Sequence, residues 1–134
     1  MLSITKEFTF DAAHHLVLPH LSSEENRALY GPCAMVHGHT YKLQVTISGT
    51  CDQSGMVINF CTLKKLVKDH ILDRYDHADL NTLPEYQEIP PTAENMALFI
   101  FQTLASVLNS ERYQLQEIRV YETPNAWAKV TADA

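Results

Sequence analysis

The chain has 134 residues, which suits one ordinary domain over residues 1–134 and is too short for two. Apolar residues make up 46% of it and the formal net charge is −6, so we expect a globular core and no nucleic-acid partner, because phosphate binding needs a basic face. No stretch approaches the roughly 18 apolar residues of a membrane helix, and residues 1–10 alternate polar and apolar types, so we expect no signal peptide, no membrane association and a cytoplasmic location.

The first predicted element is a strand over residues 4–14, in which polar and apolar residues alternate. One face of this strand carries Phe8, Phe10, Ala12 and His14. Residues 16–36 then form a connection of about 20 residues, and connections of that length are usually functional or disordered. The clearest strand covers residues 37–48, where His37 and His39 begin a row of alternating apolar side chains.

The remaining predicted elements are a turn region over 49–55, a short strand over 56–60, a helix over 62–75, an irregular segment over 76–89, a helix capped by Thr92, and strands over 114–123 and 126–132 around a turn at Pro124 and Asn125. Segregated strands and helices predict an α+β domain, with two helices on one face of an antiparallel sheet. Four strands leave exposed edges, which pairing with another subunit would hide.

Three histidines form the strongest candidate site. His37 and His39 stand two residues apart on one strand, so both imidazoles point to the same side. His14 ends the apolar face of the first strand and reaches the same point if the two strands pair. Three neutral histidines with an open fourth position are a catalytic zinc arrangement. His15 is an alternative third ligand, and a short His-x-His motif is also compatible with histidines that merely make local hydrogen bonds.

Cys33 lies four residues before His37, in the long connection. A nearby cation lowers the pKa of a thiol, so Cys33 is a candidate proton acceptor beside the metal. The alternative is a small buried apolar residue, which we expect for Cys51 and Cys61. Three cysteines give an odd count, which does not indicate a disulfide framework.

Two acidic positions complete the candidates. Asp76 precedes His77 just past the first helix, and a carboxylate beside a histidine sets its tautomer and raises its basicity. A histidine at a helix end that merely meets the helix dipole is the alternative. Glu122 continues the apolar row of the strand over 114–123. Burying a carboxylate there costs free energy unless hydrogen-bond donors contact it. The paired N–H groups of a pterin or guanine would supply them; the alternative is that the strand has already reached solvent.

Five motifs occur in the order Phe10-Asp11-Ala12-Ala13-His14, Cys33-Ala34-Met35-Val36-His37-Gly38-His39, Asp76-His77-Ala78-Asp79-Leu80-Asn81, Pro91-Thr92-Ala93-Glu94-Asn95 and Tyr121-Glu122-Thr123. Together they resemble the 6-pyruvoyltetrahydropterin synthase / 6-carboxytetrahydropterin synthase family over almost the whole chain. The resemblance implies the tunnelling fold, a ββααββ unit that assembles into a barrel through its strand edges. It also implies a homohexamer of two stacked trimers and 7,8-dihydroneopterin triphosphate as the substrate.

The resemblance further implies roles for the candidate residues. Zinc would be held by His14, His37 and His39, and Cys33 would abstract a proton. Asp76 and His77 would be its catalytic partners, contributed across a subunit boundary. Glu122 would anchor the pterin ring, and Thr92 and Glu94 would line the same pocket.

The spacing within the motifs bears on which reaction the resemblance implies. Three residues between Cys33 and His37 resemble the bacterial carboxy-forming branch of the family, which releases acetaldehyde and triphosphate in an early step toward queuosine. The segments 21–26 and 30–31 instead resemble the animal pyruvoyl-forming branch. We favour the carboxy-forming reaction because the short spacer positions the thiol directly. A non-catalytic pterin or purine binder would not need Cys33, and a dihydroneopterin aldolase of the same fold would not use zinc.

Overall fold

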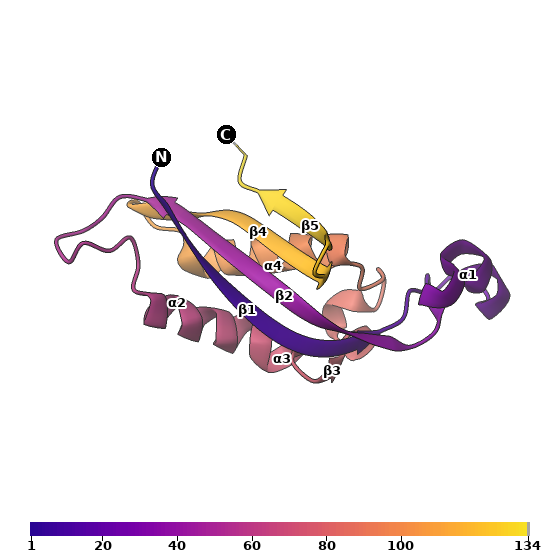
Figure 1. Cartoon of the computed structure of the whole chain (residues 1–134). Coiled ribbons are helices and arrows are strands. Elements are labelled where there is room, and N and C mark those ends of the chain that lie inside the picture. The colour runs from indigo at the N-terminus through magenta and orange to yellow at the C-terminus, as the bar shows by residue number, and fades with distance from the viewer. Residues whose placement is uncertain (134) are drawn as a thin grey trace.

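The computed structural model describes residues 1–133 and consists of one five-stranded sheet with helices packed against one of its faces (Figure 1). The sheet order is β3-β1-β2-β4-β5. The strands are β1 (Ser3–His14), β2 (His37–Gly49), β3 (Ala78–Asp79), β4 (Tyr113–Thr123) and β5 (Ala126–Thr131). The helices are α1 (Ser23–Tyr30), α2 (Phe60–Val67), α3 (Asp73–Tyr75) and α4 (Ala93–Leu108).

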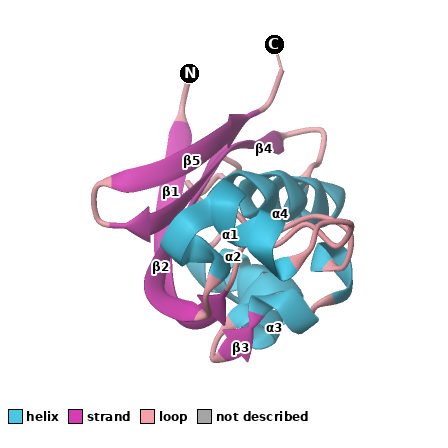
Figure 2. Cartoon of the chain, turned by 90° about the vertical axis from the view of Figure 1, so that its right-hand side faces the viewer, coloured by secondary structure: helices cyan, strands magenta, loops and turns pink. Residues whose placement is uncertain are grey.

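Side-chain alternation along β1 and β2 divides the sheet into an apolar and a polar face. The two strands pair antiparallel without a break, from Ser3 opposite Ser48 to His14 opposite His37. Their apolar residues point toward α2 and α4, which lie on the same side of the sheet (Figure 2). Fully buried members of this core include Leu43, Val45, Ile47, Leu63, Val67, Met96, Ile100 and Leu104. Burying each such side chain stabilises the fold by about 1.5–3 kcal/mol.

The prediction of a purely antiparallel sheet is wrong in one respect. Strand β3 pairs parallel with β1, with Ala12 opposite Ala78 and Ala13 opposite Asp79, so the sheet is mixed. We expected residues 76–89 to be irregular, and they contain this strand together with two 3-10 turns. A two-residue strand shows no alternation in a sequence, because alternation needs several residues to be visible.

The short strand predicted over 56–60 is also wrong. Val57 and Ile58 are buried in the core, but they lie in a loop. Asn59 ends that loop and caps α2, since its side-chain oxygen accepts a hydrogen bond from the amide of Cys61 at 2.8 Å. The predicted helix over 62–75 therefore begins two residues earlier, at Phe60. It runs through α2, a π-helical turn over Lys68–Leu72, and α3.

The long connection over 16–36 is an ordered segment. Ser22 and Glu25 form a reciprocal capping box at the start of α1. The buried amide of Asn26 then ties the helix to the backbone of Leu18 and Leu21. A 3-10 turn over Gly31–Ala34 leads into β2. This segment lies beyond the end of the β1–β2 ladder (Figure 1).

Two further predicted features are confirmed, the cap of the second helix and the last two strands. Thr92 caps α4 by accepting a hydrogen bond from the amide of Asn95 at 3.1 Å. Strands β4 and β5 pair antiparallel around the turn at Pro124 and Asn125. Within residues 1–133, no helix combines the length and the apolar character that crossing a membrane requires.

Candidate metal centre

The register of β1 and β2 gathers His14, His37 and His39 at one end of the ladder. His14 stands directly opposite His37, and His39 follows two residues later on the same face. One ring nitrogen from each histidine lies within 4.8 Å of the others. The neighbouring His15 does not belong to this group; its amide donates instead to the side chain of Asn81 at 2.9 Å. The structure therefore selects His14 as the third member of the cluster.

Backbone carbonyls fix the orientation of two of these rings. The Nδ1 atom of His14 lies 2.8 Å from the carbonyl oxygen of Pro91, and that of His37 lies 2.7 Å from the carbonyl oxygen of Met35. A carbonyl only accepts, so both Nδ1 atoms carry the proton in the neutral rings and both Nε2 atoms keep a lone pair. Such backbone contacts are typical of the outer shell of metal-ligating histidines.

The nitrogens that face inward are better placed to bind a cation than to form hydrogen bonds with one another. The Nε2 atoms of His14 and His37 are 3.0 Å apart, but with both protons on Nδ1 no hydrogen joins them. The Nε2 atom of His39 is buried and has no hydrogen-bond partner among the described residues. Unpaired buried nitrogens are rare and call for a partner. Three converging lone pairs therefore match the donor set of a zinc site.

Burial also keeps these histidines in the form that binds a metal. Desolvation lowers the pKa of His14 below its ordinary value and outweighs the hydrogen bond to the Pro91 carbonyl. Desolvation likewise lowers the pKa of His39 and outweighs the attraction of Glu122. Both rings are therefore neutral at neutral pH, and no proton needs to leave before a cation binds.

Glu122 lies against the histidine cluster. Its Oε1 atom is 3.6 Å from Nε2 of His14 and 3.8 Å from Nε2 of His39, and its side chain is 33% exposed. The pairing of β4 with β5 shifts register between Tyr121 and Thr123, at the position of Glu122. The carboxylate thus offers negative charge beside the donor nitrogens while part of it still reaches solvent.

The other predicted residues lie around this cluster in different ways. Cys33 is exposed in the 3-10 turn over Gly31–Ala34, and its carbonyl accepts the amide of Leu16 at 2.8 Å. Thr92 and Glu94 begin α4, directly after Pro91, whose carbonyl contacts His14. Cys51 and Cys61 are also exposed, so our expectation that they are buried apolar residues is wrong.

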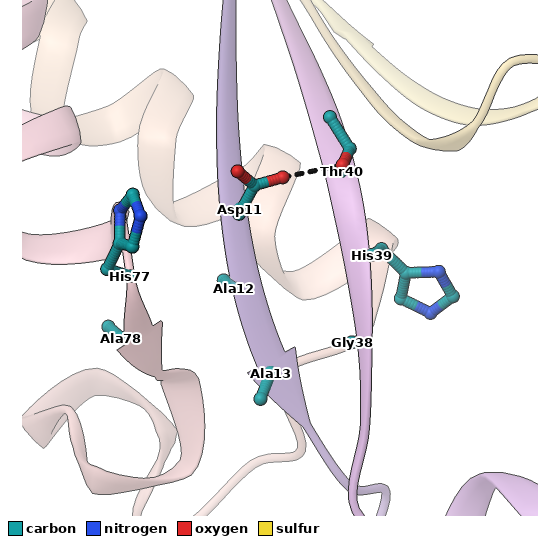
Figure 3. A pocket seen from close by; sticks show the side chains of 8 residues that line it. All are labelled: Asp11, Ala12, Ala13, Gly38, His39, Thr40, His77 and Ala78. Carbon is teal, nitrogen blue, oxygen red and sulfur yellow. Dashed lines mark hydrogen bonds between the residues drawn. The ribbon is translucent and has the colours of Figure 1, made fainter.

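Asp76 and His77 belong to a second cluster on the opposite side of the ladder. Nδ1 of His77 lies 3.0 Å from Oδ1 of Asp76. His77 lines a cavity of about 480 Å³ with Asp11, Ala12, Ala13, Gly38, His39, Thr40 and Ala78. Figure 3 shows the His77 ring on the β3 side of β1 and the His39 ring pointing away beyond β2. Within one chain, the rings of His77 and His39 therefore lie on different sides of these two strands.

Sequence reasoning missed four contributors to these clusters. The carbonyls of Met35 and Pro91 orient the histidines, yet a backbone carbonyl leaves no mark in residue identity. Asp11 and Thr40 contact the second cluster. An antiparallel pairing of the first two strands that sets His14 opposite His37 also sets Asp11 opposite Thr40. The contact between Asp11 and Thr40 could therefore have been predicted from the sequence.

The fold and the site together define an α+β domain that carries three histidines placed to hold a metal ion at the end of a β-ladder. A family model described as 6-pyruvoyl tetrahydropterin synthase matches residues 3–133. The chain therefore belongs to the 6-pyruvoyl tetrahydropterin synthase family, whose members are pterin lyases with the tunnelling fold, and its histidine triad is consistent with the zinc site of that family.

Individual relatives agree with this assignment. A 6-pyruvoyl tetrahydrobiopterin synthase of Dictyostelium discoideum is 37% identical over 91% of this chain and 90% of its own length. A 6-carboxy-5,6,7,8-tetrahydropterin synthase of Haemophilus influenzae is 38% identical over 96% of this chain and 98% of its own. The solved 6-pyruvoyl tetrahydropterin synthase of Caenorhabditis elegans superimposes with a TM-score of 0.89 at 30% identity, covering 98% of this chain and 96% of its own. Overall identity therefore does not select one reaction.

Proposed function

We propose that this protein is a zinc-dependent lyase that converts 7,8-dihydroneopterin triphosphate to 6-carboxy-5,6,7,8-tetrahydropterin, with release of acetaldehyde and triphosphate. The observation that carries the proposal is the convergence of three histidine ring nitrogens in a member of this pterin family. Zinc bound there would supply Lewis acidity toward oxygens of the substrate side chain. The product would serve a 7-deazapurine pathway such as that to queuosine.

The chain supplies its own proton-transfer groups. Cys33 presents an exposed thiol in the turn that leads into His37, where it can take a proton from the substrate. Asp76 faces Nδ1 of His77, which favours a proton on that nitrogen and leaves Nε2 to accept or return one. The His77 side chain is 79% exposed, so it is accessible to a substrate held by another chain.

Three residues are proposed to contact the substrate. Glu122 is proposed to anchor the pterin ring, from whose paired N–H groups its carboxylate would accept hydrogen bonds; its Oε1 atom lies 3.6 Å from Nε2 of His14 and 3.8 Å from Nε2 of His39. Thr92 and Glu94 at the start of α4 are proposed to line the same pocket.

The pyruvoyl-forming reaction is the second candidate. It would use the same groups but keep the three-carbon side chain and eliminate only triphosphate. The ordered segment with α1 favours it, because residues 21–26 and 30–31 resemble the animal-type enzymes. The three-residue spacer between Cys33 and His37 favours the carboxy-forming reaction instead. A non-catalytic binder leaves Cys33 unused, and an aldolase without zinc leaves the histidine triad unused.

Mass spectrometry of the products separates these candidates. Purified protein loaded with zinc is incubated with 7,8-dihydroneopterin triphosphate, and acetaldehyde is trapped in parallel. We expect the 6-carboxy product, acetaldehyde and triphosphate. Triphosphate without acetaldehyde would identify the pyruvoyl-forming reaction. Unchanged substrate, with the pterin bound but intact, would support a binding protein and contradict both reactions.

We further propose that the active site is shared between subunits of a homohexamer made of two stacked trimers. Two observations support sharing. Within one chain, the His77 ring lies on the β3 side of β1 and the His39 ring points away beyond β2 (Figure 3). Strand β3 covers only Ala12 and Ala13 of β1, so most of that edge is open to pair with another copy, as is the outer edge of β5.

Subunit mixing tests this arrangement. Cys33→Ala and His77→Ala chains should each keep only a small residual activity alone. After dissociation and joint reassembly, some interfaces would combine an intact Cys33 with an intact His77, and we expect activity to return to a clear fraction of the wild-type value. Mixed oligomers are verified by tagging one chain. Verified mixed oligomers that stay at the residual level would contradict a shared site.

A further inference from the structure

We propose that Asp11 is a positioning residue for the Asp76–His77 pair, and that the hydroxyl of Thr40 holds the Asp11 carboxylate in place. Neither Asp11 nor Thr40 was a candidate from the sequence. The catalytic meaning of this inference rests on the proposed function, because that function gives His77 its task. The geometric part, a carboxylate placed beside the His77 ring, stands on the structure alone.

The backbone of Asp11 binds both members of the pair. Its amide donates to Oδ1 of Asp76 at 3.1 Å, the same oxygen that faces Nδ1 of His77. Its carbonyl accepts the amide of His77 at 2.6 Å. His77 has a φ of +62°, and among the described residues other than glycine it alone has a positive φ. A left-handed backbone conformation is unfavourable for residues other than glycine. The hydrogen bond from the His77 amide to Asp11 on β1 offsets part of that cost.

The side chain of Asp11 extends this arrangement to the neighbouring strand. Its Oδ1 atom accepts a hydrogen bond from the hydroxyl of Thr40 at 2.5 Å. One ligand atom each from Asp11, Asp76 and His77 lies within 4.8 Å of the others. Figure 3 shows the Asp11 carboxylate between Thr40 and His77, with only one oxygen bonded to Thr40. The His77 ring therefore lies beside two carboxylate side chains, those of Asp76 and Asp11.

Glu7 provides a matched control on the same strand. It lies four residues earlier on the same polar face of β1, and its carboxylate accepts a hydrogen bond from Gln44 of β2 at 2.7 Å, as Asp11 does from Thr40. Glu7→Gln and Asp11→Asn each remove one negative charge and keep an acceptor oxygen. A general effect of surface charge would appear in both variants, whereas a positioning role appears only in Asp11→Asn.

The first readout is the separation of kcat from KM. We expect Asp11→Asn to lower kcat roughly 10- to 100-fold, the size typical of a disturbed catalytic geometry, with KM, zinc content and melting temperature nearly unchanged. Thr40→Val should lower kcat in the same direction, and Thr40→Ser should restore it. In a His77→Ala background, Asp11→Asn should cause no further loss, because the two residues act as one unit. A wild-type kcat in Asp11→Asn, or a full extra loss in the double variant, would overturn the proposal.

The second readout needs no turnover. The ring resonances of His77 are compared at one fixed pH in the wild type, Asp11→Asn and Glu7→Gln, each with zinc bound. We expect a clear shift in Asp11→Asn and none in Glu7→Gln. Unchanged His77 resonances in Asp11→Asn would contradict the placement, whatever the enzyme catalyses. Wild-type protein that leaves the triphosphate substrate intact would refute the proposed function instead, so the two failures are distinguishable.

Discussion

Cys33→Ala is expected to lower kcat by about 10²- to 10⁴-fold, the range typical of a lost proton-transfer group, and to leave the zinc content unchanged. The thiol is exposed in the turn before His37, whereas the three inward-facing nitrogens would supply the ligands of a three-histidine site without it. The measurement combines steady-state kinetics with metal analysis of the same preparation. Binding of the pterin substrate should survive, because the thiol moves a proton and does not hold the ring.

Cys51→Ala and Cys61→Ala are suitable controls, because both cysteines are also exposed. Cys51 lies in the turn region after β2, and Cys61 lies in the first turn of α2. Both variants should keep nearly full activity. Loss of zinc from Cys33→Ala would make the thiol a metal ligand, and full activity in that variant would remove it from the mechanism.

His39→Ala is expected to reduce the zinc content from about one ion per chain, as in a three-histidine site, to nearly none. The Nε2 atom of His39 is buried and has no hydrogen-bond partner within residues 1–133, so we expect it to be a ligand whose removal weakens metal binding. The side chain is 19% exposed, and its loss should leave the fold intact by circular dichroism. Activity should fall with the metal, and added zinc should restore little of it.

His15→Ala is the matched control for the metal centre. His15 follows His14 directly, but it lies outside the cluster of converging nitrogens. We expect this variant to retain its zinc. Zinc retained by His39→Ala and lost from His15→Ala would move the third ligand to His15 and contradict the geometry described above.

The sequence predicts the cluster of three histidines well, because side chains alternate strictly between the two faces of a strand. Knowing only that residues 4–14 and 37–48 are paired strands, one can place His14, His37 and His39 on one face. The cap at Thr92 is also visible in the sequence, because a helix cap depends only on neighbouring residues. The strand predicted over 56–60 failed because Val57 and Ile58 are buried without a strand partner, and burial alone resembles a strand.

The contacts that complete the clusters depend on tertiary structure. Strand β3 exists because the segment after α3 returns alongside β1, which no local pattern reveals. The carbonyl of Pro91 meets His14 only because α4 begins beneath the sheet. Separation of the His77 ring from the His39 ring likewise follows from the position of β1 and β2 between them, and it becomes evident only when the strands are assembled.

Strand β1 carries parts of both clusters at alternating positions, and this restricts how its length can evolve. His14 points to the helix-covered face and Asp11 to the open face, three residues apart. Because the side-chain period of a strand is two, a slip of one residue against β2 would exchange the faces of both at once. Single substitutions can adjust either cluster separately. An insertion or deletion within this strand would damage both together, so lineages of this protein should vary in β1 by replacement and hardly ever by length.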